Sequence, residues 1–234
     1  MTTCRRGAAL LCAALLLGPL AAGAGAQAVP DGDVICPPDQ VDRFTDDDGS
    51  VHERSINCAA TYGLVFGIGP ATFGPNLPLN RGQAATILIG YVEQSLGEVL
   101  PQVPDGARPV FTDTAGNVHE NNIERAEDNG ILTGFADGTF RPAQPVTRAQ
   151  YATIVVQATE AIIGEELGVD RIEDFDDDDA SVHEVNIEKA FDNGILNGAG
   201  PRTFNPGAPV TRGQATTILV GALVNVLLPL GVFD

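Results

Sequence analysis

Three kinds of side chain that can bind ligands recur at regular spacing along this chain of 234 residues. Arginine can grip a carboxylate or phosphate at two points, and aspartate and histidine bond to sugar hydroxyls or to metal ions. The arginines are Arg81, Arg148 and Arg212, the aspartates Asp46, Asp113 and Asp177, and the histidines His52, His119 and His183. A site that is present three times is more natural for binding than for catalysis, so we predict a binding protein.

The three arginines are predicted at the first position of a helix, where the helix dipole disfavours a cation by about 0.3 to 1 kcal/mol. Together with the free amides of the helix start, a guanidinium would form a site for a carboxylate or phosphate. The alternative is a salt bridge from each arginine to the aspartate of a neighbouring repeat, which would hold the repeats together. The residues alone leave both interpretations open.

The histidines are predicted at the second position of shorter, peripheral helices. Packing or hydrogen bonding is the favoured role, and contact with a sugar is the alternative; no cysteine joins them, which disfavours a metal site. The acidic runs Asp46–Asp48 and Asp174–Asp179 lack the spaced ligand loop of an EF-hand, so a solvated acidic loop is favoured over calcium binding. We therefore predict no metal site and no cofactor.

No enzyme signature is found in the sequence. It lacks a Gly-x-Ser-x-Gly elbow, a phosphate-binding glycine-rich loop followed by lysine, and a His-Glu-x-x-His motif. A pair of carboxylates for sugar hydrolysis is the remaining enzymatic alternative, and the threefold repetition favours binding over it.

The elements that position these residues form an internal repeat. Phe44, Phe111 and Phe175 align at separations of 67 and 64 residues, and no gap is needed over the 40-residue core that follows each one. Residues of the same type recur at the same offsets: Ile56, Ile123 and Ile187; Gly63, Gly130 and Gly194; Gly67, Gly134 and Gly198; Phe73, Phe140 and Phe204; Pro75, Pro142 and Pro206; Gln83, Gln150 and Gln214.

Each copy reads as helix, loop, helix. The first helix is predicted to begin with a capping box, in which Ser50, Asn117 or Ser181 precedes a glutamate by three residues, and to end at Gly63, Gly130 or Gly194. A second capping box pairs Asn80 with Gln83, Thr147 with Gln150, and Thr211 with Gln214. The longer apolar helices that follow are Gln83–Leu96, Gln150–Ile163 and Gln214–Leu228.

These second helices are predicted to form a shared core at the centre, because one copy is too small to bury its own apolar faces. Ile154 is predicted to lie in this core. The last helix contains Thr216, Thr217, Asn225 and Pro229, so we predict a core helix rather than a membrane span.

The repeat resembles the S-layer homology family. The second copy is closest, with Phe-Thr-Asp at Phe111, Gly-Ile-Leu-Thr-Gly at Gly130, Asp-Gly-Thr-Phe-Arg-Pro at Asp137 and Val-Thr-Arg-Ala-Gln at Val146. The resemblance implies a mainly α fold of three helix-loop-helix repeats about a pseudo-threefold axis. It also implies grooves between repeats that bind secondary cell-wall polymers, often pyruvylated. The chain departs from the family by having no Trp, by a histidine where Trp is usual, and by Gln in place of Glu after Thr-Arg-Ala.

The chain begins with the features of a secretory signal peptide, namely Arg5, Arg6, an apolar run over 8–22 and small residues up to Ala26. In an exported protein, Cys36 and Cys58 are predicted to form a disulfide, with two buried thiols as the alternative. The predicted organisation is a signal peptide 1–26, an N-terminal extension 27–43, repeats 44–97, 111–164 and 175–234, and linkers 98–110 and 165–174.

The chain is strongly acidic, with a formal net charge of −18 that becomes −20 without the signal peptide. Such a charge disfavours binding to nucleic acid or to an anionic membrane surface. We predict a secreted protein of the cell wall or S-layer that binds an anionic cell-wall polysaccharide non-covalently. The rival is a protein-protein interaction module whose partner is another envelope protein.

Overall fold

The computed structural model describes residues 36–37, 40–103, 110–169 and 174–232, and these residues fold mainly into α-helices. Each repeat contributes a short first helix and a longer second helix, as predicted. The first helices are α2 (Glu53–Thr61), α4 (Glu120–Asp128) and α6 (Glu184–Asp192). The second helices are α3 (Arg81–Leu96), α5 (Arg148–Ile163) and α7 (Arg212–Ala222), the last continued by a π-helical turn, η2 (Leu223–Leu227).

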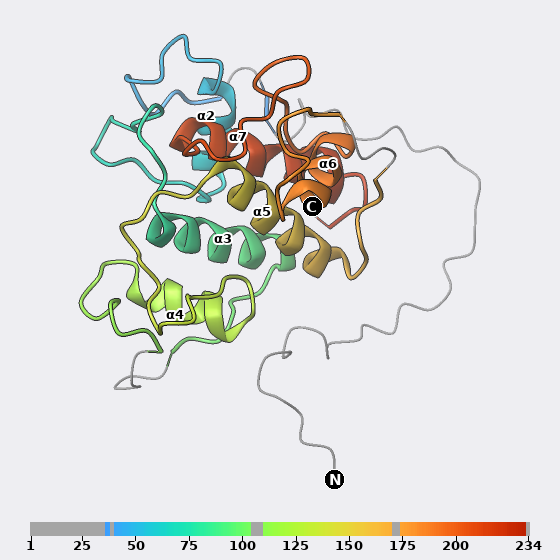
Figure 1. Cartoon of the computed structure of the whole chain (residues 1–234). Helices are drawn as coiled ribbons and strands as arrows, with labels where there is room; N and C mark the ends of the chain where they lie inside the picture. The colour runs from blue at the N-terminus through green and yellow to red at the C-terminus, as the bar shows by residue number, and fades with distance from the viewer. Residues whose placement is uncertain (1–35, 38–39, 104–109, 170–173, 233–234) are drawn as a thin grey trace, which may run out of the picture.

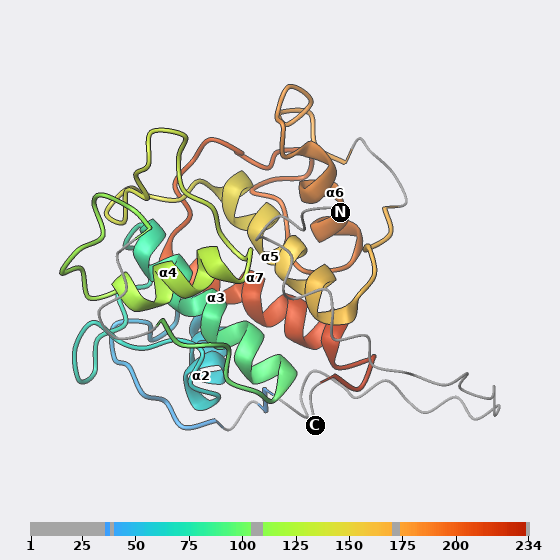
Figure 2. The same cartoon turned by 90° about the horizontal axis from the view of Figure 1, so that it is seen from below.

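The second helices form the centre of the molecule and the first helices surround them (Figures 1 and 2). Helix α5 packs against both α3 and α7. Each first helix packs on a second helix of another repeat: α4 on α3, α6 on α5, and α2 on α7. The last of these contacts joins the third repeat to the first and closes the three repeats into a ring.

A ring of backbone hydrogen bonds marks the pseudo-threefold axis. The amide of Leu79 donates to the carbonyl of Val210, that of Val210 to Val146, and that of Val146 back to Leu79, each at 2.9 Å. All three residues are buried. Because each repeat gives one donor and one acceptor, the ring is complete only when all three repeats are present.

The second helices begin as the sequence predicts, with complete capping boxes at Asn80, Thr147 and Thr211. The predicted capping box of the first helices is wrong. Helix α2 begins at Glu53 with His52 as its N-cap residue, whose side chain makes no capping hydrogen bond. Ser50 Oγ instead accepts from the amide of His52, and Glu53 Oε2 accepts from the amide of Gly49. These two bonds form a tight turn ahead of the helix, because the serine lies two residues before the capping position, His52.

Glycines end the first helices and admit an aromatic ring. Gly63, Gly130 and Gly194 have φ of 69°, 68° and 67°, the left-handed conformation that was predicted. Four residues later, a Cβ on Gly134 would lie 2.0 Å from the ring of Phe111, and Gly67 and Gly198 meet Phe44 and Phe175 in the same way. The repeated glycine is therefore required by the packing of the repeated phenylalanine.

The N-terminal part of the described chain is linked covalently to α2. Cys36 and Cys58 form a disulfide, as predicted. The predicted signal peptide 1–26 and most of the extension 27–43 lie outside the described residues, as do parts of both predicted linkers. None of the helices in the described ranges has the length and apolar character needed to cross a membrane.

Burial distinguishes two residues of the central helices. Leu88 in α3 is fully buried, whereas Ile154 in α5 is only partly buried, so the prediction that Ile154 belongs to the inner core is wrong. We expect Leu88→Ala to lower the free energy of unfolding by about 2 to 5 kcal/mol, because a cavity remains in the shared core. Ile154→Ala should cost about 1 kcal/mol. Denaturant titration of both variants measures the difference; equal losses would contradict the arrangement.

Candidate functional site

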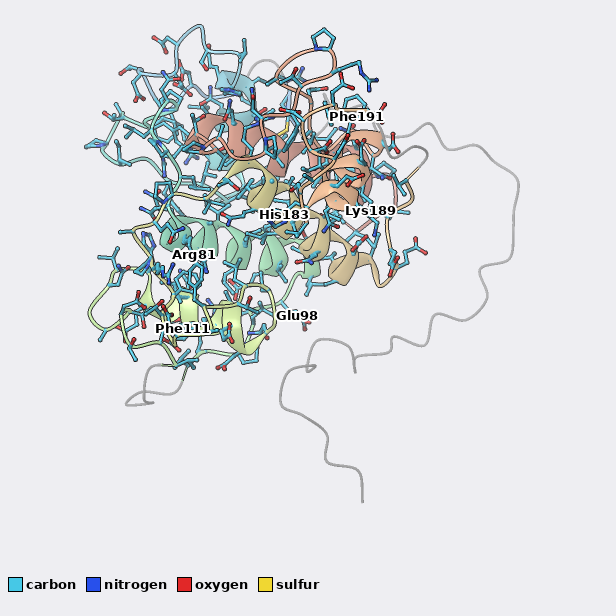
Figure 3. The ribbon with its side chains drawn as sticks, viewed as in Figure 1. Arg81, Glu98, Phe111, His183, Lys189 and Phe191 are labelled. Carbon is cyan, nitrogen blue, oxygen red and sulfur yellow. A yellow bond between two sulfur atoms is a disulfide. The ribbon has the colours of Figure 1, made fainter. Side chains whose placement is uncertain are left out.

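The three arginines hold neighbouring repeats together through backbone carbonyls. Their Nε atoms donate to the carbonyl of the repeated phenylalanine in another repeat: Arg81 to Phe140 at 2.7 Å, Arg148 to Phe204 at 2.8 Å, and Arg212 to Phe73 at 2.9 Å. Their Nη2 atoms donate to a second carbonyl in the same repeat as that phenylalanine: those of Thr133, Asn197 and Phe66. Figure 3 shows Arg81 beside the second repeat, which carries Phe111. Each guanidinium also lies 4.5 or 4.6 Å from the phenylalanine ring centroid.

The same phenylalanines explain why an aspartate recurs at a fixed position in each repeat. Asp46 accepts from the amides of Phe73 and Gly74 at 2.7 and 2.8 Å, within its own repeat. Phe73 therefore bonds to Asp46 through its amide and to Arg212 through its carbonyl. Asp113 and Asp177 do the same for Phe140 and Phe204. The salt bridge between arginine and aspartate, which was the alternative interpretation, is replaced by this indirect link, since these residues make no direct ion pair within the described chain.

The premise of free helix-start amides is also wrong. The amides of Arg212 and Gly213 donate to the carbonyls of Leu77 and Pro75 at 2.9 Å, and the other two second helices are covered in the same way by Gln144, Pro142, Ala208 and Pro206. Burial lowers the pKa of Arg212, and the nearby charge of Asp46 opposes that shift. The cation at the start of each helix is thus stabilised by carbonyls of the next repeat.

This arrangement predicts that Arg212→Lys destabilises the fold by about 2 to 4 kcal/mol, because lysine loses the planar fork and leaves buried carbonyls unpaired. The matched control is Arg141→Lys. Arg141 forms an exposed ion pair with Asp137, so its replacement should change stability by less than about 0.5 kcal/mol. Chemical unfolding of both variants tests the comparison, and a harmless Arg212→Lys would contradict the clamp.

The three histidines lie at the same repeat boundaries. Nδ1 of His52, His119 and His183 is 2.8, 2.9 and 2.9 Å from the hydroxyls of Thr217, Thr86 and Thr153. Burial lowers the pKa of all three, which keeps them neutral at pH 7. Packing and hydrogen bonding were the favoured prediction for these residues. Nε2 of His52 makes no hydrogen bond to any described residue.

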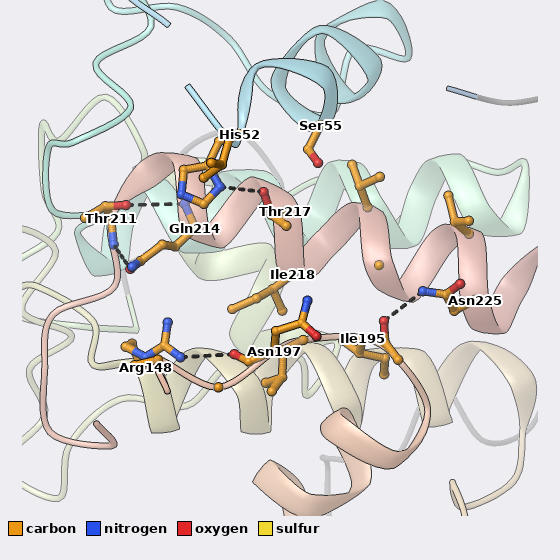
Figure 4. Close-up of a pocket in the computed structure, with 18 of the residues that line it drawn as sticks. His52, Ser55, Arg148, Ile195, Asn197, Thr211, Gln214, Thr217, Ile218 and Asn225 are labelled. Carbon is orange, nitrogen blue, oxygen red and sulfur yellow. Dashed lines mark hydrogen bonds between the residues drawn. The ribbon is translucent and has the colours of Figure 1, made fainter. Parts of the chain in front are cut away.

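A large pocket lies where α2 meets α7, with a volume of about 880 Å³ (Figure 4). All three repeats line it: Val51, His52 and Ser55 from the first, Arg148 from the second, and the turn 194–199 with one face of α7 from the third. Arg148 is held against the carbonyl of Asn197, and Asn225 donates to the carbonyl of Gly194 at 2.7 Å. These walls are therefore held by contacts within the third repeat and between it and the second.

The lining of this pocket differs in charge from the rest of the protein. It includes Arg54 and Arg148 and no acidic residue among the described residues around it, in a chain with 31 acidic and 13 basic residues. The polar groups are those of hydroxyl and amide side chains: Ser55, Thr211, Thr217, Asn197, Asn205, Asn225 and Gln214. A second pocket of about 420 Å³, between α4 and the end of α5, is lined by Glu160, Glu165 and Glu166 and by no basic residue. Of these two pockets in the described part of the chain, the first is the better suited to an anion.

The family model of the S-layer homology domain matches three segments of the chain, residues 43–85, 110–152 and 176–216, which together make up more than half of it. The chain belongs to the S-layer homology domain family. The matched segments are the three repeats described above, and each spans a first helix, the loop with the clamped phenylalanine and the start of a second helix.

Similar proteins come from bacterial cell surfaces. The cellulosome-anchoring protein of Acetivibrio thermocellus is 26% identical over 63% of this chain and 32% of its own length. An S-layer protein of Bacillus licheniformis is 26% identical over 71% of this chain and 18% of its own. Cell surface glycoprotein 1 of A. thermocellus is 28% identical over 45% of this chain and 5% of its own. The chain thus spans at most a third of these relatives. As an S-layer homology protein, it is assigned to the secreted proteins of the cell wall or S-layer.

The sequence did not point to the polar residues of the large pocket. Asn197 aligns with Thr133 and Phe66 in the other repeats, so it is not part of the repeated pattern. Gln214 is repeated, but it was interpreted only as a cap. The sequence signal that points to them is a difference between the copies. Positions near the glycine turn contain different residues in the three repeats, so one copy can have a ligand-binding residue that the others lack.

Asp178, in the acidic run of the third repeat, is buried together with a second carboxyl group, Glu188 on α6. Asp178 and Glu188 are both buried, at the positions that Thr114 and Glu124 occupy in the second repeat. There the hydroxyl of Thr114 donates to Glu124 Oε1 at 3.0 Å, but Asp178 makes no hydrogen bond to another described residue through either oxygen. Desolvation, followed by neighbouring negative charges, raises the pKa of Asp178 to about 6 and that of Glu188 to about 7. The prediction of a solvated loop therefore fails for Asp178.

A carboxyl whose pKa is raised by folding favours the folded state below its unfolded pKa, near 4, and loses that contribution as the pH rises through 6 to 7. The histidines act in the opposite direction, because their lowered pKa makes protonation unfavourable to the fold. A comparison of variants separates the two effects. Asp178→Thr should be more stable than the wild type at pH 8 and lose this advantage at pH 4, whereas Asp179→Thr, at an exposed position, should follow the wild type. Thermal unfolding across this range is the measurement; parallel curves would contradict the assignment.

Proposed function

We propose that this chain binds an anionic cell-wall polysaccharide non-covalently in the pocket between α2 and α7, and that this binding anchors it at the cell envelope. The observation that carries the proposal is the absence of carboxylates from the described lining of a large pocket in so acidic a protein. An acid group on the polymer would be repelled almost anywhere else on the surface. The names of the cellulosome-anchoring and S-layer relatives support an anchoring role.

The pocket offers groups for both parts of such a ligand. Nη1 of Arg148 makes no hydrogen bond within the described chain, so it can donate to a carboxylate while Nε and Nη2 hold the fold. Hydroxyl and amide side chains can bond to sugar hydroxyls. The chain has no Trp, and the apolar contact falls to aliphatic residues such as the exposed Val51 at the rim and Val224. Binding would depend on hydrogen bonds and charge more than on stacking.

The roles proposed for the nine repeated residues differ. Arg148 and His52 would contact the ligand directly, since both line the pocket. Asp46, Asp113 and Asp177 would act by holding the loops on which the clamps depend. Arg81 and His119 lie at the boundary between the first and second repeats. Arg212 and His183 lie at the same boundaries as His52 and Arg148, but they do not line the pocket. We propose a supporting role for these four residues. The proposed activity is binding, with no catalytic step and no cofactor.

Matched variants test the pocket. His52→Gln and His119→Gln remove the same type of contact to threonine, but only His52 faces the pocket. We expect a similar loss of stability in both and a five- to tenfold weaker affinity, corresponding to about 1 to 1.4 kcal/mol, in His52→Gln alone. Cosedimentation with purified cell-wall sacculi, at a temperature where both variants are folded, measures affinity. Equal affinities for the two variants would contradict this location.

The same assay tests the ligand. Binding should disappear when the secondary polymer is removed chemically from the sacculi, and it should weaken as salt screens the charge of the polymer. Asn197→Ala removes an exposed pocket side chain and keeps the carbonyl that accepts from Arg148, so its effect reports on ligand contact rather than on the clamp. Thr133→Ala, at the aligned position of the second repeat, is its control.

A second candidate function is docking to another envelope protein. One observation favours it: Phe66, Ile68 and Leu77 of the first repeat are all exposed, and Ile68 and Leu77 converge beside Gly74. The third repeat has no such apolar cluster, because the aligned residues there are Asn197, Ala199 and Ala208. If sacculus binding survives polymer removal and is lost in the triple variant Phe66→Ser, Ile68→Ser, Leu77→Ser, this second function replaces the first.

A further inference from the structure

The loop that leads into α2 carries three carboxylates that point toward one spot. Asp42, Asp47 and Asp48 each offer one oxygen, and these oxygens lie within 4.8 Å of one another. Oxygen ligands of one calcium ion lie at about 2.3 to 2.6 Å from it, so two of them are at most about 5 Å apart. The three carboxylates can therefore reach a single ion without rearrangement of the backbone.

Asp47 distinguishes this cluster from an ordinary acidic surface loop. Its side chain is 1% exposed, and neither carboxylate oxygen makes a hydrogen bond to another described residue. A buried carboxylate without a partner is costly, and such groups are normally paired or bound to a metal. Desolvation first, and then the charges of Asp42, Asp46 and Glu53, raise the pKa of Asp47 to about 6. Because this value lies below 7.5, the group is mostly charged at pH 7.5.

The second repeat shows what this position contains when there is no unpaired charge. In the second repeat, Thr114 replaces Asp47 and donates to Glu124 on α4. In the first repeat, Asn57 occupies the helix position of Glu124, and the acidic residue is instead Asp47 in the loop. The amide of Asn57 lies 3.5 Å from Asp42 Oδ1 and leaves Asp47 without a donor. The buried carboxylate of the first repeat therefore lacks a positively charged partner, which the uncharged threonine of the second repeat does not require.

We infer that Asp42, Asp47 and Asp48 form a binding site for a hard divalent cation, with calcium the best fit. Calcium accepts carboxylates in irregular loops and completes its shell with water or carbonyl oxygens, whereas magnesium requires near-ideal octahedral geometry. The ion would tie the segment before Phe44 to the loop after it, and so hold the turn from which α2 and His52 begin. This inference does not depend on the proposed polysaccharide binding, and it departs from the solvated loop predicted from the sequence.

The test uses the whole protein after treatment with EDTA and dialysis, with calcium chloride alone as the probe at pH 7.5. For a dissociation constant of about 0.1 to 1 mM, typical of extracellular calcium modules, 10 mM calcium should raise the melting temperature by about 3 to 10 °C over sodium chloride of equal ionic strength. Equilibrium dialysis should find one calcium ion per chain. The same shift in sodium chloride, or no bound calcium, would overturn the inference.

Two variants assign the ion to this loop. Asp47→Thr copies Thr114 of the second repeat, so it should fold and lose the calcium-dependent shift. Asp178→Thr makes the same change in the third repeat and should keep it. Asp48→Asn, at an exposed position, should weaken calcium binding about tenfold without altering the melting temperature in EDTA, which guards against a folding defect in Asp47→Thr. Retention of the shift in Asp47→Thr, or its loss in Asp178→Thr, would show that the ion binds elsewhere.

Discussion

The structure depends on one interaction that is made three times, the bond from an arginine to the phenylalanine carbonyl of another repeat. Arg212, only 6% exposed, shows why it is so constraining. A buried guanidinium requires hydrogen-bond acceptors. Here the acceptors are backbone carbonyls, because water cannot reach a boundary that is closed to solvent. Since Asp46 holds the amide of the same phenylalanine, the loop has little freedom to move away. The clamp therefore determines where each second helix begins relative to its neighbour.

Closure of the ring follows from this constraint, and the pocket follows from closure. The contact of α2 with α7 joins residues far apart in the sequence, and Arg212 and the amide of Gly213 reinforce it by engaging the loop of the first repeat. The large pocket is bounded by that same contact. Ligand binding at this place would stabilise the closed ring, because a ligand that binds only the folded state adds its binding free energy to that of folding.

The repeat and its helices could be predicted because each depends on local residues. The capping residues Asn80 and Gln83 bond to each other's backbone, and the glycine turns need only a left-handed conformation, so spacing along the sequence was sufficient. The capping box at Ser50 was wrong because a serine three residues before a glutamate also fits a turn that precedes the helix. The partners of Arg148 could not be predicted from residue types, since backbone carbonyls carry no signature in the sequence. The pocket was missed for a related reason: Asn197 and Arg148 come from different repeats and meet only in the folded protein.

Threefold repetition explains the frame, whereas differences between the copies account for the two candidate binding sites. The clamped positions must stay equivalent, because each repeat both donates and accepts across a boundary and a change in one would leave the next unpaired. Positions outside the clamps are not constrained in this way, so their residues can differ between the repeats. The residue one place after Asp46, Asp113 or Asp177 is an unpaired buried acid in two repeats and a bonded threonine in the other. The residue on the turn is Phe66, Thr133 or Asn197. Because one frame holds all three boundaries, a single substitution at such a position changes the chemistry of one repeat while the clamps of the other repeats stay the same.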